Sequence, residues 1–151
     1  MNDKLILSGK KILFVEDDVF VADVILLHLQ NAGANIVHVD SGKEAMVALM
    51  REEFDIVLTD LAMSLGTGVD LLEFIRSNEN ERIKNIPVLV LTNLEKDNPL
   101  VQQASQLGVQ GFFAKSSTPL PEIISKISDI LGIEEGSEPP VNVNIPRDIM
   151  Q

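Results

Sequence analysis

Along most of the chain, short apolar runs alternate with longer segments of helical periodicity. The run at 11–15 (KILFV) is followed by acids, as is typical of a strand buried in a parallel sheet. Comparable runs occupy 35–39, 56–59, 88–91 and 111–114. Strands and helices in strict alternation predict a three-layer α/β fold, in which right-handed crossovers join parallel strands and helices cover both faces.

The helices between these runs carry recognisable start and stop signals. In the segment 19–32, Phe20, Val24 and Leu27 fall on one helical face, and Gly33 ends the helix.

Further along, three helix starts can be placed from the sequence. Ser41 and Glu44 form a capping box ahead of the second helix. Asn98, with Pro99 at the first helical position, begins a later one, and 118–119 begin the last.

Composition excludes several classes of protein. The chain has no Cys, which excludes a disulfide scaffold, a thiol nucleophile and a zinc-thiolate site. Its formal net charge of −11 would repel nucleic acid, so we expect no DNA binding. No segment resembles an export signal or a membrane span, and we expect a cytoplasmic protein.

Five polar residues share a position at, or just after, the carboxyl end of a predicted strand. Such strand ends converge on one crevice in an open parallel sheet, and these folds bind ligands there. Three carboxylates gathered in this crevice would need a cation, and hard oxygen ligands select Mg²⁺. The residues are Glu16, Asp17, Asp60, Thr92 and Lys115.

This set is suited to phosphoryl transfer. With a metal present, Asp60 could attack phosphorus as a carboxylate nucleophile. Lys115 would neutralise charge on the transferred group, and Thr92 would donate a hydrogen bond to one of its oxygens. Each residue alone also has a purely structural interpretation, as helix-terminal charge, turn former, strand residue or solvated lysine.

Over roughly residues 10–132, the chain resembles the receiver domain of bacterial response regulators. The similarity rests on the order and spacing of 12–18 (ILFVEDD), 55–63 (DIVLTDLAM), 87–92 (PVLVLT) and 104–115 (ASQLGVQGFFAK). It implies a flavodoxin-like, doubly wound (βα)5 sheet with strand order 2-1-3-4-5.

The resemblance also implies individual roles. Glu16, Asp17, Asp60 and the backbone carbonyl of Ala62 would hold Mg²⁺, with Asp60 as phosphoacceptor and Lys115 on the phosphoryl oxygens. Asp18, beside the acid pair, is assigned instead to the helix N-cap.

Thr92 and Phe112 would form the family's switch pair. Thr92 would be drawn toward the phosphoryl group, and Phe112 would rotate inward behind it. The alternative for Phe112 is a permanently buried core aromatic.

Three positions depart from the family's usual pattern. Ser64 and Ser116 stand where the family has proline, the second of them in a cis peptide, and Asn93 stands where Ala or Gly is usual. A cis bond before a non-proline residue costs about 2.5–4 kcal/mol, so the Lys115–Ser116 peptide is either trans or strained. Asn93 could narrow access to the site or offer a further hydrogen bond, and we expect it to alter phosphorylation and dephosphorylation rates.

We therefore expect a phosphorylation-controlled switch of a two-component or phosphorelay system, and not a conventional enzyme. A histidine kinase or phosphotransfer protein would phosphorylate Asp60. The surface of the fourth helix, fifth strand and fifth helix would then contact a downstream protein or a second copy.

Two alternatives remain. A degenerate receiver could serve as a constitutive binding or dimerisation module. A phosphohydrolase of the haloacid-dehalogenase type would need an acid where Ala62 stands.

The remaining features point to no second activity. Residues 133–151 are acidic and contain proline, and we expect them to be disordered or loosely docked, although Val141, Val143 and Ile145 could pair with a sheet edge. His28 and His38 are expected to be ordinary packing or surface residues.

Overall fold

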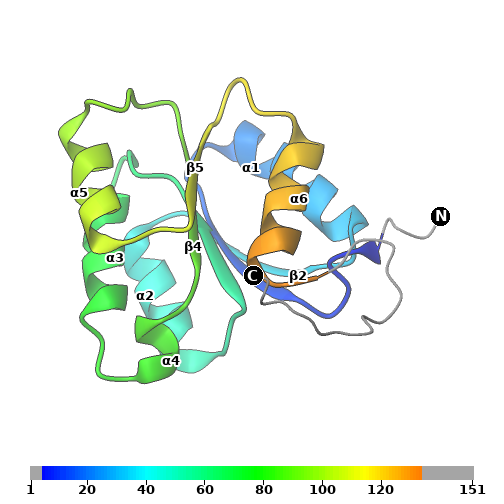
Figure 1. Ribbon diagram of the computed structural model, residues 1–151, viewed down its shortest axis with the longest axis horizontal. Coiled ribbons are helices and arrows are strands. Elements are labelled where there is room, and N and C mark those ends of the chain that lie inside the picture. Colours follow the sequence, from blue (N-terminus) through cyan, green and yellow to red (C-terminus); the bar gives the residue numbers. More distant parts are fainter. Residues whose placement is uncertain (1–4, 134–151) are drawn as a thin grey trace, which may run out of the picture.

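Five strands form one parallel sheet in the order β2-β1-β3-β4-β5 in the computed structural model, which describes residues 5–133 (Figure 1). The predicted α/β class and the strand order implied by the resemblance are therefore confirmed. The suggested pairing of 141–145 with a sheet edge lies outside the described residues. In chain order, the elements are β1 (Lys11–Val15), α1 (Val19–Asn31), β2 (Asn35–Val39), α2 (Gly42–Arg51), β3 (Ile56–Thr59), α3 (Gly68–Arg76), α4 (Glu81–Lys84), β4 (Val88–Thr92), α5 (Pro99–Leu107), β5 (Gly111–Ala114) and α6 (Leu120–Ile130).

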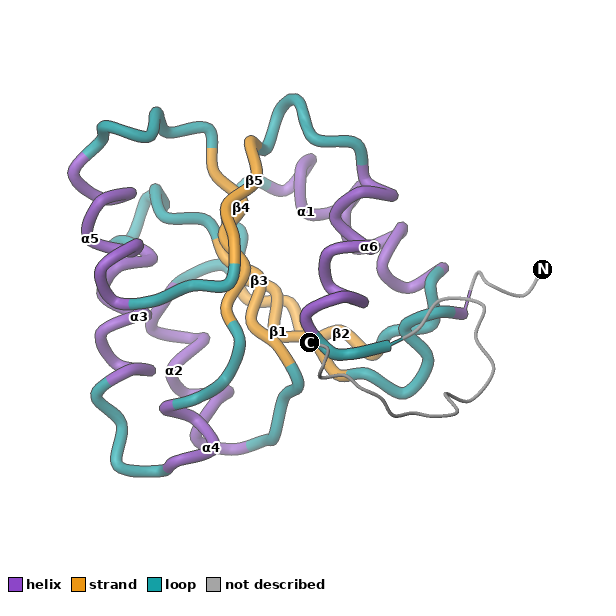
Figure 2. The backbone as a smooth tube through the Cα atoms, in the orientation of Figure 1, coloured by secondary structure: helices purple, strands orange, loops and turns teal. Residues whose placement is uncertain are grey.

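Helices cover both faces of the sheet and complete the three layers (Figure 2). Residues that alternate along β1 point to opposite faces, so Leu13 joins the core beneath α2, α3 and α5, whereas Phe14 joins the core beneath α1 and α6. Strands β3 and β4 are buried along their whole length. This burial explains why they are continuous apolar runs instead of alternating ones.

The helix N-caps follow the sequence signals closely. The Asp18 carboxylate accepts hydrogen bonds from the amides of Phe20 and Val21, and Ser41 caps α2 through the amide of Glu44. Asn98 caps α5 ahead of Pro99. The last helix begins at Leu120, slightly later than predicted, and its N-cap, a proline, offers no side-chain hydrogen bond.

The orientation of α1 corrects one prediction. The face that carries Phe20, Val24 and Leu27 points to solvent, where these side chains are 83%, 51% and 54% exposed. The buried face is instead formed by Ala22, Ile25 and Leu29. Because α1 is apolar on nearly every side, its sequence pattern does not single out one inward face.

A one-turn helix, α4, interrupts the predicted strict alternation between α3 and β4. Asn80 caps it by accepting a hydrogen bond from the amide of Arg82, and Ile83 packs into the core. A helix of four residues is too short to show a helical period in the sequence. The structure thus has six helices among the described residues, instead of the predicted five.

The side chain of Arg76 joins three segments on this side of the molecule. Its guanidinium donates to the carbonyls of Lys84 and Ile86, each at 2.8 Å, and twice to the carbonyl of Gly108, at 2.9 and 3.1 Å. One half-buried side chain therefore provides hydrogen-bond donors for backbone carbonyls at the end of α4, before β4 and before β5.

The segment before β1 also packs onto the core. Leu7 is fully buried with Phe14 and Leu29, and its amide donates to the carbonyl of Ala32 at 2.8 Å. Among residues 5–133, every helix is too short or too polar to cross a lipid bilayer.

We predict that Arg76→Ala destabilises the protein by about 3 kcal/mol, because it leaves three carbonyls without their charged donor. Urea unfolding followed by circular dichroism measures the change. The matched control is Arg82→Ala, which removes a solvent-exposed guanidinium 3.6 Å from Glu53 and is expected to cost less than about 0.5 kcal/mol. Equal losses in the two variants would contradict the bridging role of Arg76.

Candidate functional site

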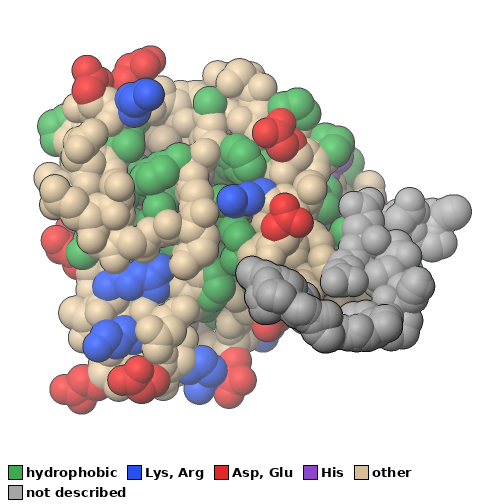
Figure 3. All heavy atoms as spheres, in the orientation of Figure 1, with side chains coloured by type: hydrophobic (Ala, Val, Ile, Leu, Met, Phe, Trp, Pro, Cys, Tyr) green, Lys and Arg blue, Asp and Glu red, His purple; other side chains and the backbone are tan. Residues whose placement is uncertain are grey.

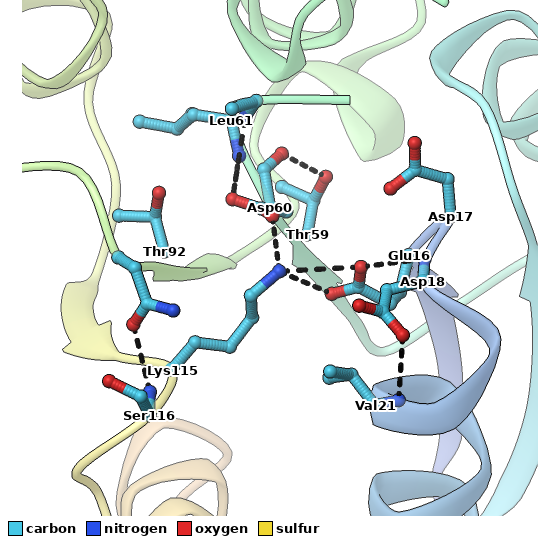
Figure 4. Close-up of polar contacts among 12 residues, drawn as sticks. Glu16, Asp17, Asp18, Val21, Thr59, Asp60, Leu61, Thr92, Lys115 and Ser116 are labelled. Atoms are coloured by element: carbon cyan, nitrogen blue, oxygen red, sulfur yellow. Dashed lines mark hydrogen bonds and ion pairs between the residues drawn. The ribbon is translucent and has the colours of Figure 1, made fainter. Parts of the chain in front are cut away.

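The predicted site residues come from four strands whose carboxyl ends meet at one edge of the sheet. Glu16 and Asp17 follow β1, Asp60 follows β3, Thr92 ends β4 and Lys115 follows β5. Because the strands are parallel, side chains far apart in the sequence lie side by side here (Figure 4). The predicted gathering of Glu16, Asp60 and Lys115 is present as direct contacts.

The ammonium of Lys115 lies between two buried carboxylates. Its Nζ is 2.6 Å from Oδ2 of Asp60 and 3.1 Å from Oε1 of Glu16. Asp60 and Glu16 are only 4% and 1% exposed. Burial lowers the pKa of Lys115, but the hydrogen bonds and charges of Asp60 and Glu16 outweigh it, so the pKa of Lys115 is raised overall and the amine stays charged.

The second oxygen of Asp60 is held by the backbone. Oδ1 accepts from the amide of Leu61 at 2.6 Å and from the amide of Ala62 at 3.3 Å. These donors and Lys115 together fix both carboxylate oxygens, as suits an oriented nucleophile. These backbone donors are a part of the site that the sequence alone does not reveal.

Gly68 allows the chain to close over this turn. A Cβ at this position would lie 2.2 Å from the carbonyl oxygen of Asp60 and 3.0 Å from Cα of Leu61. The Gly68 amide donates to the Leu61 carbonyl at 2.9 Å. Any side chain at 68 would therefore displace the backbone that orients Asp60, a role that a glycine at the start of a helix does not reveal in the sequence.

Asp17 is turned toward Ser64. Its Oδ2 accepts from the Ser64 hydroxyl at 2.5 Å and from the Ser64 amide at 2.7 Å. These two hydrogen bonds lower the pKa of Asp17 below its ordinary value, so it is a carboxylate at neutral pH. The departure at position 64 thus supplies two donors, neither of which proline has.

Glu16 is the most deeply buried acid of the site. Burial raises the pKa of Glu16, and the opposing hydrogen bonds from the amide of Asp18 and from Lys115 reduce that shift without cancelling it. On the other side of its backbone, Nε2 of His38 lies 2.9 Å from the Glu16 carbonyl oxygen. His38 therefore packs beside the site without entering it, as expected of a packing residue.

Three acids and one ammonium leave the site with more negative than positive charge. Within residues 5–133, no three acidic or histidine side chains are already grouped in a way that would hold a metal ion. The donor set nevertheless fits a hard divalent cation, because every candidate ligand is an oxygen atom and the surplus charge is negative.

Thr92 and Phe112 lie on the same face of the sheet. Phe112 pairs in register with Val90, two residues before Thr92. Thr92 is buried and its Oγ1 accepts from the amide of Leu94 at 3.3 Å, whereas Phe112 is 37% exposed. The interpretation of Phe112 as a permanently buried core aromatic is therefore wrong.

The open question about the Lys115–Ser116 peptide is answered. It is trans, as is every other peptide bond among the described residues. The amide of Ser116 donates to Oδ1 of Asn93 at 2.8 Å, so two of the three departures from the family pattern are joined by one hydrogen bond.

Comparison with known proteins agrees with this fold. The family model of the response regulator receiver domain matches residues 12–128 of this chain. The chain is 37% identical over 120 residues to the chemotaxis protein CheY of Pseudomonas aeruginosa, covering 78% of this chain and 94% of that one. It is 34% identical over 127 residues to CheY-3 of Vibrio cholerae, covering 82% of this chain and 95% of that one.

Solved structures show the same fold. The receiver domain of the sensor histidine kinase PA1611 of Pseudomonas aeruginosa superposes with a TM-score of 0.74 at 24% identity, covering 83% of this chain and 99% of that one. CheY4 of Vibrio cholerae superposes with a TM-score of 0.66 at 23% identity, covering 78% and 98%.

We predict that Ser64→Ala raises the pKa of Asp17 toward its ordinary value of 3.8, because the stronger of its two hydrogen-bond donors is lost. A carboxyl group whose pKa is lower in the folded protein than in the unfolded chain stabilises the fold at pH values above its unfolded-state pKa. This stabilisation is lost as the pH falls through its folded-state pKa. The variant should therefore be less stable than the parent at neutral pH, and the difference should vanish in strong acid. Carbon-13 NMR titration of the Asp17 carboxyl measures the shift, with Ser105→Ala as an exposed control. An unchanged pKa would contradict the assignment.

Proposed function

This chain belongs to the response regulator receiver domain family, and we propose that it works as a phosphorylation-controlled signalling switch whose phosphoacceptor is Asp60. Receiver domains are signalling switches and not conventional enzymes. The observation that carries the proposal is the Asp60 carboxylate, held by two backbone amides on one oxygen and by Lys115 on the other.

The reaction proposed for Asp60 is an in-line displacement at phosphorus. A carboxylate oxygen of Asp60 forms the new P–O bond, while the bond from phosphorus to the donor breaks and the leaving group keeps the electron pair. With a phosphohistidine donor the bond that breaks is P–N. Lys115, which neutralises the Asp60 carboxylate before the reaction, would then neutralise the negative charge on the oxygens of the transferred phosphoryl group. The Thr92 hydroxyl would donate a hydrogen bond to one of these oxygens.

Mg²⁺ would supply further positive charge against the transferred group. We propose that Glu16, Asp17, Asp60 and the carbonyl of Ala62 hold it. The surplus negative charge of the site supports this assignment. A magnesium ion coordinated in the active site cleft of the PA1611 receiver domain supports it as well. Ser64 already holds one oxygen of Asp17 and so fixes the direction in which the other points.

A histidine kinase or phosphotransfer protein would donate the phosphoryl group. The output surface would be α5, β5 and α6, which correspond to the fourth helix, fifth strand and fifth helix of the sequence analysis because the one-turn α4 shifts the numbering. Apolar side chains are exposed between α5 and α6, over β5 (Figure 3). Phe112 on β5 is placed to change the shape of that surface, which could bind a downstream protein or a second copy.

The alternatives find little support in the site. A degenerate receiver was suggested by Ser64, Asn93 and Ser116, yet Ser64 donates to Asp17 and the other two bind each other. None of the three disturbs the contacts of Lys115 with Asp60 and Glu16. A phosphohydrolase lacks its second acid, since Ala62 stands in that position.

We predict that acetyl phosphate with Mg²⁺ adds the mass of one phosphoryl group to the native chain and none to Asp60→Asn. Intact-mass spectrometry after acid quenching checks this. Asp55→Asn is the matched control, because Asp55 accepts a hydrogen bond from the Lys11 amide at the opposite edge of the sheet. Equal incorporation by the native chain and Asp60→Asn would refute Asp60 as phosphoacceptor.

We predict that beryllofluoride with Mg²⁺ moves Phe112 from its half-exposed position toward the interior, because Thr92 is drawn to the mimic and vacates space on the same face. Aromatic NMR signals of Phe112 should shift on titration, and Thr92→Val should abolish that shift while fluorine signals of bound beryllofluoride persist. If Phe112 does not respond although the ligand binds, the degenerate receiver is the better description.

A further inference from the structure

Two consecutive amides after β5 are tied to the end of β4. The amide of Lys115 donates to the backbone carbonyl of Thr92 at 3.1 Å and so continues the ladder between the two strands. The next amide, that of Ser116, donates at 2.8 Å to the side chain of Asn93. The backbone on both sides of the Lys115 Cα is thus attached to β4, once through the main chain and once through a side chain.

The hydrogen bond from the Ser116 amide to the Asn93 side chain connects the turn at 116–118 to a residue outside it. Beyond Lys115, the turn is held by the amides of Ser117 and Thr118, which both donate to the carbonyl of Ala114 within the same turn, at 3.3 and 3.0 Å. Those bonds shape the turn but do not attach it to β4. Of the hydrogen bonds described for residues 116–118, the one accepted by Asn93 alone fixes the turn relative to the rest of the site.

The position of this turn determines where the Lys115 ammonium lies. Lys115 has a flexible four-carbon stem, and its Nζ has to meet Asp60 at 2.6 Å and Glu16 at 3.1 Å. If the backbone shifts, the torsions of the stem have to readjust for Nζ to reach both partners, which restricts the side chain further. Restricting the backbone therefore lowers the entropic cost of placing the charge.

We propose that Asn93 is a positioning residue for phosphoryl transfer: its side-chain oxygen holds the Ser116 amide and thereby keeps Lys115 on Asp60. This inference rests on the proposed function. It also links two groups that would touch the phosphoryl oxygens, since Asn93 directly follows Thr92 and Ser116 directly follows Lys115. The bond, marked by the dashed line that ends on Ser116 in Figure 4, joins the loop after β4 to the loop after β5.

The expected effect is moderate. Asn93 and Ser116 are both exposed, so water competes for each end of the hydrogen bond. We expect Asn93→Ala to lower the maximal rate of Asp60 phosphorylation by acetyl phosphate about fivefold. The half-saturating Mg²⁺ concentration should not change, because Asn93 is not among the proposed ligands.

The decisive experiment compares Asn93→Ala in two backgrounds of full-length protein. Ser116→Ala keeps the amide N–H, whereas Ser116→Pro removes it. Asn93→Ala should slow phosphorylation about fivefold in the first background and leave the rate unchanged in the second. Equal slowing in both backgrounds would overturn the proposal, because Asn93 would then act without the Ser116 amide.

A measurement on the unphosphorylated protein separates this proposal from the function on which it rests. The Ser116 amide proton and the Lys115 Nζ nitrogen should both shift in NMR spectra of Asn93→Ala. Asn93→Asp keeps an accepting oxygen, so its Ser116 amide proton should stay at or downfield of the native position, as expected of a hydrogen-bonded amide. Asn85→Ala, at the opposite edge of the sheet, is the control and should leave both signals in place. Unshifted signals in Asn93→Ala would overturn the positioning role. A shifted Ser116 amide in Asn93→Ala and a hydrogen-bonded one in Asn93→Asp, together with absence of phosphorylation of the native chain, would refute only the proposed function.

Discussion

Three carboxylates at one edge of a buried sheet impose the constraint around which this site is organised. Like charges repel strongly where water is scarce, and Glu16 and Asp60 are almost fully buried. This repulsion is offset by Lys115, which lies between Glu16 and Asp60. Each of the three carboxylates also accepts a hydrogen bond from a backbone amide or from a serine. The negative charge that is left over fits the Mg²⁺ ion proposed for this site.

Much of this arrangement follows from the sequence, because a parallel sheet brings the carboxyl ends of its strands to one edge. Once 11–15, 56–59 and 111–114 are recognised as strands, the acids and the lysine that follow them are expected at one edge, and the strand order implied by the resemblance brings them together. The helix caps at Asp18, Ser41 and Asn98 are equally local, since each depends on an amide two or three residues away. Such short-range rules do not require knowledge of the tertiary structure.

What the sequence does not reveal depends on distant backbone. The inward face of α1 cannot be chosen from a helix that is apolar on most sides, and α4 is too short to have a period. The bond from Ser116 to Asn93 joins residues 23 apart, through an amide that no side chain signals. A side chain at Gly68 is excluded because its Cβ would lie 2.2 Å from the carbonyl oxygen of Asp60 and 3.0 Å from Cα of Leu61, closer than van der Waals contact allows.

Leu7 has a consequence for how the molecule can be divided. Its side chain fills space under α1 beside Phe14 and Leu29, and its amide closes the end of that helix through Ala32. A fragment cut immediately before β1 would leave a void lined by these side chains and an unsatisfied carbonyl. The packed part of the molecule therefore extends upstream of the first strand, and a fusion partner is best joined ahead of the segment that contains Leu7.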